Sequence, residues 1–85
     1  MKTIHKEEYK ILIDCLKQFR KSANLTQLEL AERIGTDQTY ISKYERCERR
    51  LDIIELMAIC QGLNIKFSKF VRVYEDQLKK KKLLL

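Results

Sequence analysis

The stretch AERIGTDQTYISKYE, residues 31–45, has the pattern of two helices separated by a break of only a few residues. Gly35 is suited to end the first helix, because glycine adopts a positive φ without a steric penalty. Asp37 follows as a residue that can cap a new helix, and Ile41 and Tyr44 are spaced to face inward from it. Two helices joined so tightly must cross at a steep angle, which leaves one face of the second helix uncovered.

The uncovered face of this second helix is polar. It carries Gln38, Thr39, Ser42 and Lys43, with Tyr40 and Arg46 at its edges. A helix-turn-helix has this geometry, and its second helix enters the major groove of DNA. Glutamine can bond N6 and N7 of adenine, and lysine can donate to N7 and O6 of guanine. The residue types on this face therefore suit the reading of base edges.

Helical periodicity continues on both sides of this pair. The first segment carries an apolar stripe formed by Tyr9, Leu12, Leu16 and Phe19. The T-x-x-E box of Thr26 and Glu29 opens the second helix, and Asp52 with Glu55 opens a fourth in the same way. A fifth helix is predicted from about Ser68 to Gln77. We therefore expect one domain over residues 1–78, followed by a basic and apolar tail, residues 79–85, that we expect to be disordered.

Composition limits the classes of protein to which the chain can belong. It has 85 residues, no proline and two glycines, with 45% apolar and 35% charged residues, which is typical of a compact, charged helical domain. It contains no apolar run of about 18 residues, so we expect no membrane span. The first residues lack the apolar core of a signal peptide. Three widely spaced cysteines without a C-x-x-C pair fit reduced thiols in a cytoplasm rather than a metal site.

The net charge of +6 suggests a polyanionic partner, but Lys79–Lys82 supply four of those charges. The positions of individual charged residues are therefore more informative than the net charge. Five cations near the central pair are either phosphate contacts or solvated surface groups: Arg20, Lys21, Arg46, Arg49 and Arg50. The lysine run either adds non-specific attraction to DNA through counterion release or is simply solvated.

The run LTQLELAERIGTDQTYISKYERCERRLDIIELMAICQGL, residues 25–63, resembles the Cro/repressor-type helix-turn-helix family, the xenobiotic-response-element-like regulators of bacteria and phages. The pattern T-Q-x-E-L-A-x-x-I-G followed by Q-x-x-I-S-K-x-E-R carries the resemblance. It implies an all-α, five-helix, lambda-repressor-like domain with the helix-turn-helix at its second and third helices. It also implies that the chain binds operator DNA as a dimer and has no catalytic site. We expect a cytoplasmic homodimer that acts as a repressor on a pseudo-palindromic double-stranded DNA operator, with no metal or cofactor.

The resemblance also assigns roles by position. Gln38, Thr39 and Lys43 are expected to face bases, while Gln27 touches a phosphate and braces Gln38. The other residues expected to contact the DNA backbone are Tyr40, Ser42, Arg46, Arg49 and Arg50. The chain departs from the family pattern at Cys47, where glycine is usual. A non-glycine residue in the left-handed conformation costs roughly 1–2 kcal/mol, so this loop either bears the strain or takes another path.

The apolar residues of the last helix exceed what a small core needs. We expect a dimer interface there, because exposed apolar clusters mark interfaces, with core packing as the alternative. The four residues concerned are Phe67, Phe70, Val71 and Tyr74.

A second hypothesis for function is an antitoxin that binds both its operator and a protein partner, for which residues 65–85 are the candidate segment. An enzyme is not expected, because the chain has one histidine, no paired inward carboxylates and no glycine-rich phosphate loop.

Overall fold

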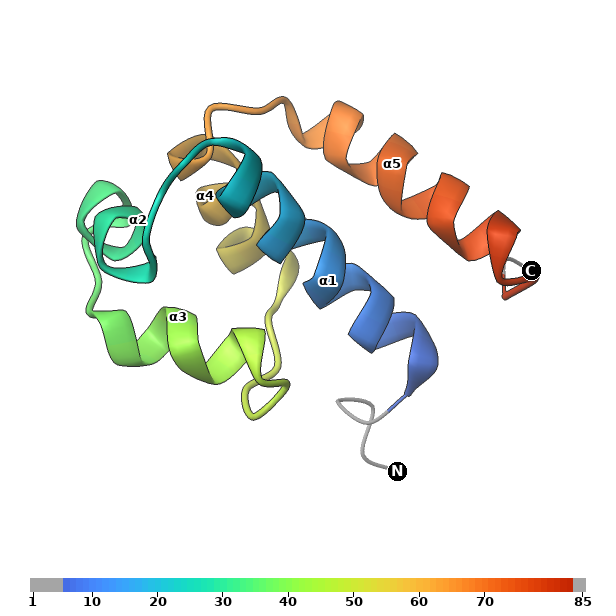
Figure 1. Ribbon diagram of the computed structural model, residues 1–85, viewed down its shortest axis with the longest axis horizontal. Helices are drawn as coiled ribbons and strands as arrows, with labels where there is room; N and C mark the ends of the chain where they lie inside the picture. The colour runs from blue at the N-terminus through green and yellow to red at the C-terminus, as the bar shows by residue number, and fades with distance from the viewer. Residues whose placement is uncertain (1–5, 84–85) are drawn as a thin grey trace.

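In the computed structural model, which describes residues 6–83, the chain forms five α-helices and no strand within that range. They are α1 (Glu7–Ser22), α2 (Gln27–Ile34), α3 (Gln38–Glu45), α4 (Ile53–Gly62) and α5 (Phe67–Lys80). Figure 1 shows α5 running alongside α1, with α3 on the other side of α1 and α2 seen nearly end-on. The all-α, five-helix class expected from the sequence is confirmed.

The crossing of α2 and α3 is built on small and buried residues. Leu30, Ala31, Ile41 and Tyr44 have no exposed surface. This confirms that Ile41 and Tyr44 are the inward residues of α3, and the small side chain of Ala31 lets the two helices approach closely. The Tyr44 hydroxyl is also buried and has no hydrogen-bond partner among the described residues. Burial raises the pKa of Tyr44, which therefore stays neutral.

The helix starts follow the chemistry expected from the sequence. Both capping boxes are formed, by Thr26 with Glu29 and by Asp52 with Glu55. The Tyr40 amide donates to Asp37 Oδ1 at 3.0 Å, so Asp37 caps α3. Because each cap satisfies amides that a helix start leaves free, the first turns of α2, α3 and α4 are fixed locally.

The backbone turns left-handed after each of the five helices in residues 6–83. The residues that do this are Asn24, Gly35, Cys47, Asn64 and Lys82, with φ between 58° and 76°. Asparagine tolerates this conformation better than most residues. Cys47, with φ of 58°, keeps the turn that glycine usually makes and bears the strain.

Replacing Cys47 with glycine is expected to raise the free energy of unfolding by about 0.5–1 kcal/mol. Glycine removes the strain of the left-handed turn from the native state. This stabilises the protein by more than the extra backbone entropy of glycine stabilises the unfolded chain. Urea unfolding followed by circular dichroism measures the change. Cys47→Ala is the matched control, because alanine removes the sulfur and keeps the strain. A glycine variant no more stable than the alanine variant would contradict this account.

The position of α5 corrects the expected dimer interface. Phe70 has no exposed surface within the single chain. Its ring centroid lies 6.0 Å from that of Phe19 on α1 and 6.4 Å from that of Tyr74. The Tyr74 hydroxyl donates to the Glu8 carbonyl oxygen at 2.8 Å. The interface prediction is therefore wrong for Phe70, and Phe67, Val71 and Tyr74 are partly buried against the same core.

The end of α5 also differs from expectation. The helix continues through Lys80, and the Leu83 amide donates to the Leu78 carbonyl oxygen at 2.9 Å. Leu83 packs against the core. Disorder of the tail is therefore wrong for residues 79–83, while residues 84–85 lie outside the described range.

Candidate nucleic-acid interface

The outer face of α3 is exposed as the sequence predicts. Gln38, Thr39, Lys43 and Arg46 are exposed, and Ser42 is half-buried. All of these except Lys43 line a shallow depression of about 280 Å³, and Lys43 lies one turn beyond Thr39. The structure thus brings the expected base-facing residues onto one open surface.

A hydrogen-bond chain runs from Glu45 through Gln27 to Gln38, and its last contact is the longest. Glu45 Oε1 accepts from Gln27 Nε2 at 2.9 Å, and Gln27 Oε1 accepts from Gln38 Nε2 at 3.4 Å. Because an ionised carboxylate only accepts, Gln27 must turn its amide nitrogen to Glu45 and its oxygen to Gln38. Gln38 then keeps one N–H and its carbonyl oxygen free to face outward. That donor and acceptor match N7 and N6 of adenine.

Glu45 is held in turn by a buried ion pair with Arg20. Arg20 Nε lies 2.7 Å from Glu45 Oε2, and Arg20 Nη2 lies 3.0 Å from Glu45 Oε1. Arg20 Nη1 donates to the Leu25 carbonyl oxygen at 2.7 Å. Both charged residues are only 8% exposed. The guanidinium therefore ties α1, the loop before α2 and α3 together, and its bonds to Glu45 raise the pKa of Arg20.

Arg20 is thus a structural residue and not one of the phosphate contacts considered from the sequence. Sequence reasoning missed the pair because each partner resembles a solvated surface charge. One signal was present: Glu45 follows Ile41 by four residues and Tyr44 by one, which places it on the inward side of α3. An acidic residue on an apolar face needs a buried cation.

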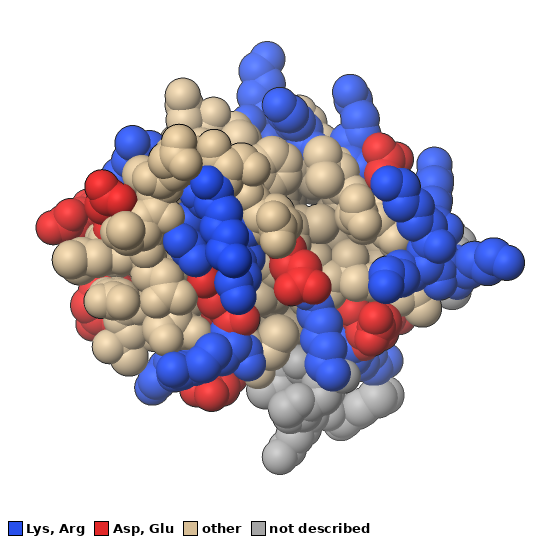
Figure 2. Space-filling model, viewed as in Figure 1, with Lys and Arg blue, Asp and Glu red and all other residues tan. Residues whose placement is uncertain are grey.

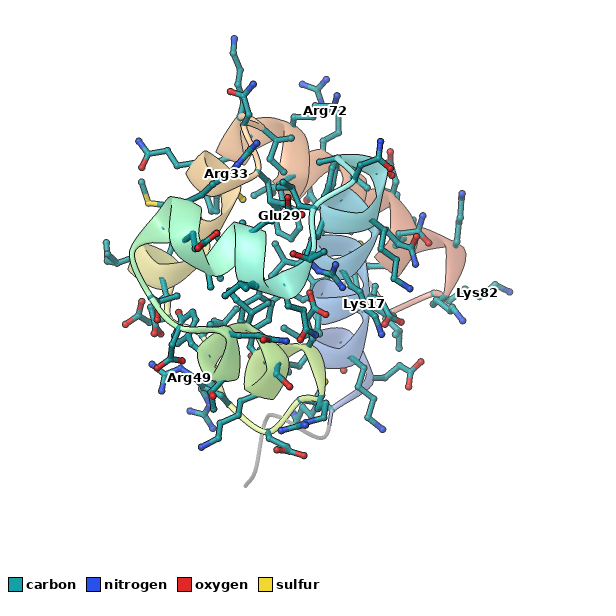
Figure 3. All side chains as sticks on the ribbon, turned by 60° about the vertical axis from the view of Figure 1, so that its left-hand side comes forward. Lys17, Glu29, Arg33, Arg49, Arg72 and Lys82 are labelled. Carbon is teal, nitrogen blue, oxygen red and sulfur yellow. The ribbon has the colours of Figure 1, made fainter. Side chains whose placement is uncertain are left out.

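Tyr40 and Arg49, both expected along the DNA backbone, make contacts within the chain. The Tyr40 hydroxyl donates to Glu55 Oε2 at 2.9 Å, and Arg49 pairs with the same carboxylate. The Arg49 guanidinium also lies 4.8 Å from the centroid of the Tyr40 ring. Burial and the bond to Glu55 raise the pKa of Tyr40 to about 12, so it remains a donor at neutral pH. Figure 3 shows Arg49 beside α3.

The remaining cations at the end of α3 are more accessible. Arg46 Nη2 lies 3.1 Å from Glu48 Oε1, and both side chains are exposed. Arg50 is exposed and has no ion pair among residues 6–83. Exposed pairs contribute little, so Arg46 can exchange Glu48 for a phosphate. Figure 2 shows basic and acidic side chains interleaved over α3, whereas basic side chains gather over the C-terminal end of α5.

Other kinds of site find little support in residues 6–83. No group of three or more His, Cys, Asp or Glu side chains there is placed to hold a metal ion. None of the helices in this range has the length and apolar character to cross a membrane.

Comparisons of sequence and of structure with known proteins indicate the same family. Residues 16–70 match the family model described as helix-turn-helix. The control protein C.SmaI of Serratia marcescens is 34% identical over 61 residues, which are 72% of this chain and 73% of that protein. An XRE-family like protein from Pseudomonas syringae pv. tomato str. DC3000 is 42% identical with a TM-score of 0.80, covering 89% of this chain and 93% of its own.

The wild-type restriction-modification controller protein C.Esp1396I superposes with a TM-score of 0.84 and 29% identity, covering 89% of this chain and 99% of its own. A tetramer of that controller protein has also been crystallised in complex with its natural 35 base-pair operator. The protein chain in that complex superposes with a TM-score of 0.83 and 28% identity, covering 87% of this chain and 97% of its own.

The chain described here belongs to the XRE-type helix-turn-helix family of DNA-binding transcriptional regulators.

Proposed function

We propose that this protein acts in the cytoplasm as a homodimer that binds a pseudo-palindromic operator and represses transcription. The observation that carries the proposal is the exposed outer face of α3 with Gln38 braced from beneath. A side chain held in one orientation discriminates between bases better than one that rotates freely, because the fixed donor and acceptor fit fewer base edges.

The contacts divide into those that read bases and those that position the protein. Gln38, Thr39 and Lys43 read base edges in the major groove. The exposed cations Arg46 and Arg50, together with Gln27 and Ser42, contact phosphates on either side. Tyr40 and Arg49 complete the phosphate contacts at the edge of α3, where Arg49 exchanges Glu55 for a phosphate oxygen.

Similarity to the control protein C.SmaI and to a restriction-modification controller protein supports a specific setting, the operator of a restriction-modification system. The antitoxin alternative required residues 65–85 to be available for a protein partner. In the structure α5 packs onto α1 through Phe70 and Tyr74, so this helix is part of the domain. We therefore keep the operator-binding regulator as the proposed function.

Gln38→Ala is expected to abolish base preference at one position of each half-site and leave the other positions unchanged. Loss of one bidentate base contact corresponds to about 1–3 kcal/mol of discrimination. Selection of binding sites from random duplexes, performed with wild type and variant, measures the effect. Identical preferences for the two proteins would refute the proposed reading of bases by α3.

Arg50→Ala is the matched control for this experiment. Because Arg50 is exposed and has no ion pair among residues 6–83, its loss removes one phosphate contact without disturbing the fold. Binding should weaken alike for all sequences, with the slope of log K against log salt reduced by about one. Arg49 is less suitable, since its removal also frees Glu55 and Tyr40.

A further inference from the structure

The C-terminal end of α5 carries a dense group of cations. Lys79, Lys80, Lys81 and Lys82 are exposed, and none of them has an ion pair within residues 6–83. Figure 2 shows basic side chains gathered at this end of the molecule. The negative end of the helix dipole favours cations in the last turn, but it is equivalent to only about half an elementary charge. The four lysines therefore leave this end of the domain strongly positive.

These lysines are carried by an ordered part of the chain. The helix continues through Lys80, and Lys82 makes a left-handed turn with φ of 58°. The Leu83 amide then donates to the Leu78 carbonyl oxygen at 2.9 Å. Leu78 is buried, and Leu83 packs against the same core. Because the backbone beneath the lysines is already fixed, a ligand that binds them orders only their side chains.

The positive end of α5 is remote from the surface that faces the operator. α1 packs against α3 on one side and against α5 on the other (Figure 1). The start of α3, with Gln38 and Thr39, lies at the opposite end of the longest axis from the end of α5, and the chain extends 35 Å along that axis. Figure 3 shows Lys82 pointing away from α3. A duplex held against α3 therefore lies on a different side of the domain from the lysines.

The chemistry of this surface suits the phosphates of a duplex. Lysine is a point charge on a flexible stem, so it binds phosphate oxygens without requiring one geometry. Consecutive helical residues advance by about 1.5 Å, and duplex DNA carries one phosphate charge per about 1.7 Å of its axis. The two charge densities are thus comparable. Contacts to phosphates carry no base information, so such a surface binds DNA of any sequence.

We propose that the C-terminal end of α5 is a second DNA-binding surface, which holds the phosphates of another duplex while α3 holds the operator. The inference rests on the operator binding of the proposed function and adds a second DNA segment to it. One protein bound at its operator then also retains a separate stretch of DNA, whatever the sequence of that stretch.

Capture of a second duplex by the full chain tests the proposal. A biotin-labelled duplex that carries the site selected from random sequences is held on beads and saturated with protein at low salt. A fluorescent duplex without that site is then added, and wild type should retain it. Three to four lysine–phosphate contacts predict that the affinity for the fluorescent duplex falls about 40- to 150-fold between about 50 and 200 mM salt.

The triple variant Lys79→Gln/Lys80→Gln/Lys82→Gln removes most of the proposed surface. It should retain the fluorescent duplex at least about 10-fold less well than wild type at low salt, because three phosphate contacts are lost. Its binding to the immobilised site should be unchanged, since α3 is untouched. Circular dichroism verifies that the fold is kept.

A second triple variant, Lys66→Gln/Lys69→Gln/Arg72→Gln, is the matched control. It removes three exposed cations at and near the start of the same helix. The two variants have the same net charge, so a difference between them reports where the cations lie and not how many there are. The control should retain the fluorescent duplex as wild type does.

Four outcomes would overturn the proposal. The first is a wild type that retains no second duplex, and the second is equal retention by the two triple variants. The third is a variant of the α5 end that binds the immobilised site less well only when the site has long flanks, which would place the lysines on the flanking DNA of the operator. The fourth is a wild type that binds vesicles containing phosphatidylserine but captures no duplex, which would assign the lysines to a membrane surface.

The outcomes separate this inference from the proposed function. Site selection measures the reading of bases by α3, whereas capture measures the binding of a second duplex. A wild type that selects a site but captures no second duplex would refute the α5 surface alone. A wild type that selects no sequence, but joins two random duplexes in a way that the α5-end variant loses, would refute the function alone.

Discussion

Glu45→Ala is expected to lower the free energy of unfolding by about 3–5 kcal/mol. The substitution leaves the Arg20 guanidinium buried without its carboxylate partner, and the desolvation of that charge is no longer compensated. Single domains have a total stability of only about 5–15 kcal/mol, so the variant should be close to unfolding at room temperature. Urea unfolding at neutral pH measures the loss.

Two variants establish that the loss comes from the buried charge. Glu48→Ala removes an exposed ion pair with Arg46 and should cost less than about 1 kcal/mol. The double variant Arg20→Met/Glu45→Met should be more stable than Glu45→Ala, because no charge remains unpaired in the core. A Glu45→Ala variant as stable as Glu48→Ala would show that the pair does not hold α1 to α3.

Phe70→Ala is expected to destabilise the chain by about 3–5 kcal/mol, since it opens a cavity between α1 and α5. Phe70 has no exposed surface in the single chain, so this loss should be the same at low and high protein concentration. A residue of a dimer interface would instead give a loss that grows with protein concentration. Unfolding at several protein concentrations therefore distinguishes core from interface.

Phe67→Ala is the control for this position. Phe67 lies at the start of the same helix and is only partly buried, so less packing is removed and the loss should be smaller. Two outcomes would support the original prediction of a dimer interface on α5. One is an equal loss of unfolding free energy in the two variants, and the other is a Phe70→Ala variant that changes only dimerisation.

The features predicted correctly from the sequence depend on neighbours along the chain. A capping box joins residues three apart, and Gly35 ends α2 by its own conformational freedom, so both can be recognised without knowing the fold. The exposed face of α3 follows from the same local spacing, because Ile41 and Tyr44 define the buried side. In these cases the helical period alone decides which residues face inward.

The features that were missed depend on contacts between distant helices. The Arg20–Glu45 pair joins residues 25 apart, and the Tyr74 hydroxyl reaches Glu8 over 66 residues. Periodicity could not show that Phe70 is covered by α1, since an apolar stripe is the same whether it meets its own chain or another. It could not show which side of α4 is bare, because both sides are apolar.

The five left-handed residues at the helix ends have an effect on the denatured ensemble as well as on the native turns. Only Gly35 among them is glycine, so at Asn24, Cys47, Asn64 and Lys82 the unfolded backbone samples fewer conformations than glycine would allow. Folding therefore surrenders less backbone entropy at these four positions. The strain of these turns destabilises the native state, while the smaller loss of backbone entropy favours folding. The residues that end the helices therefore affect the free energy of both the folded and the unfolded state.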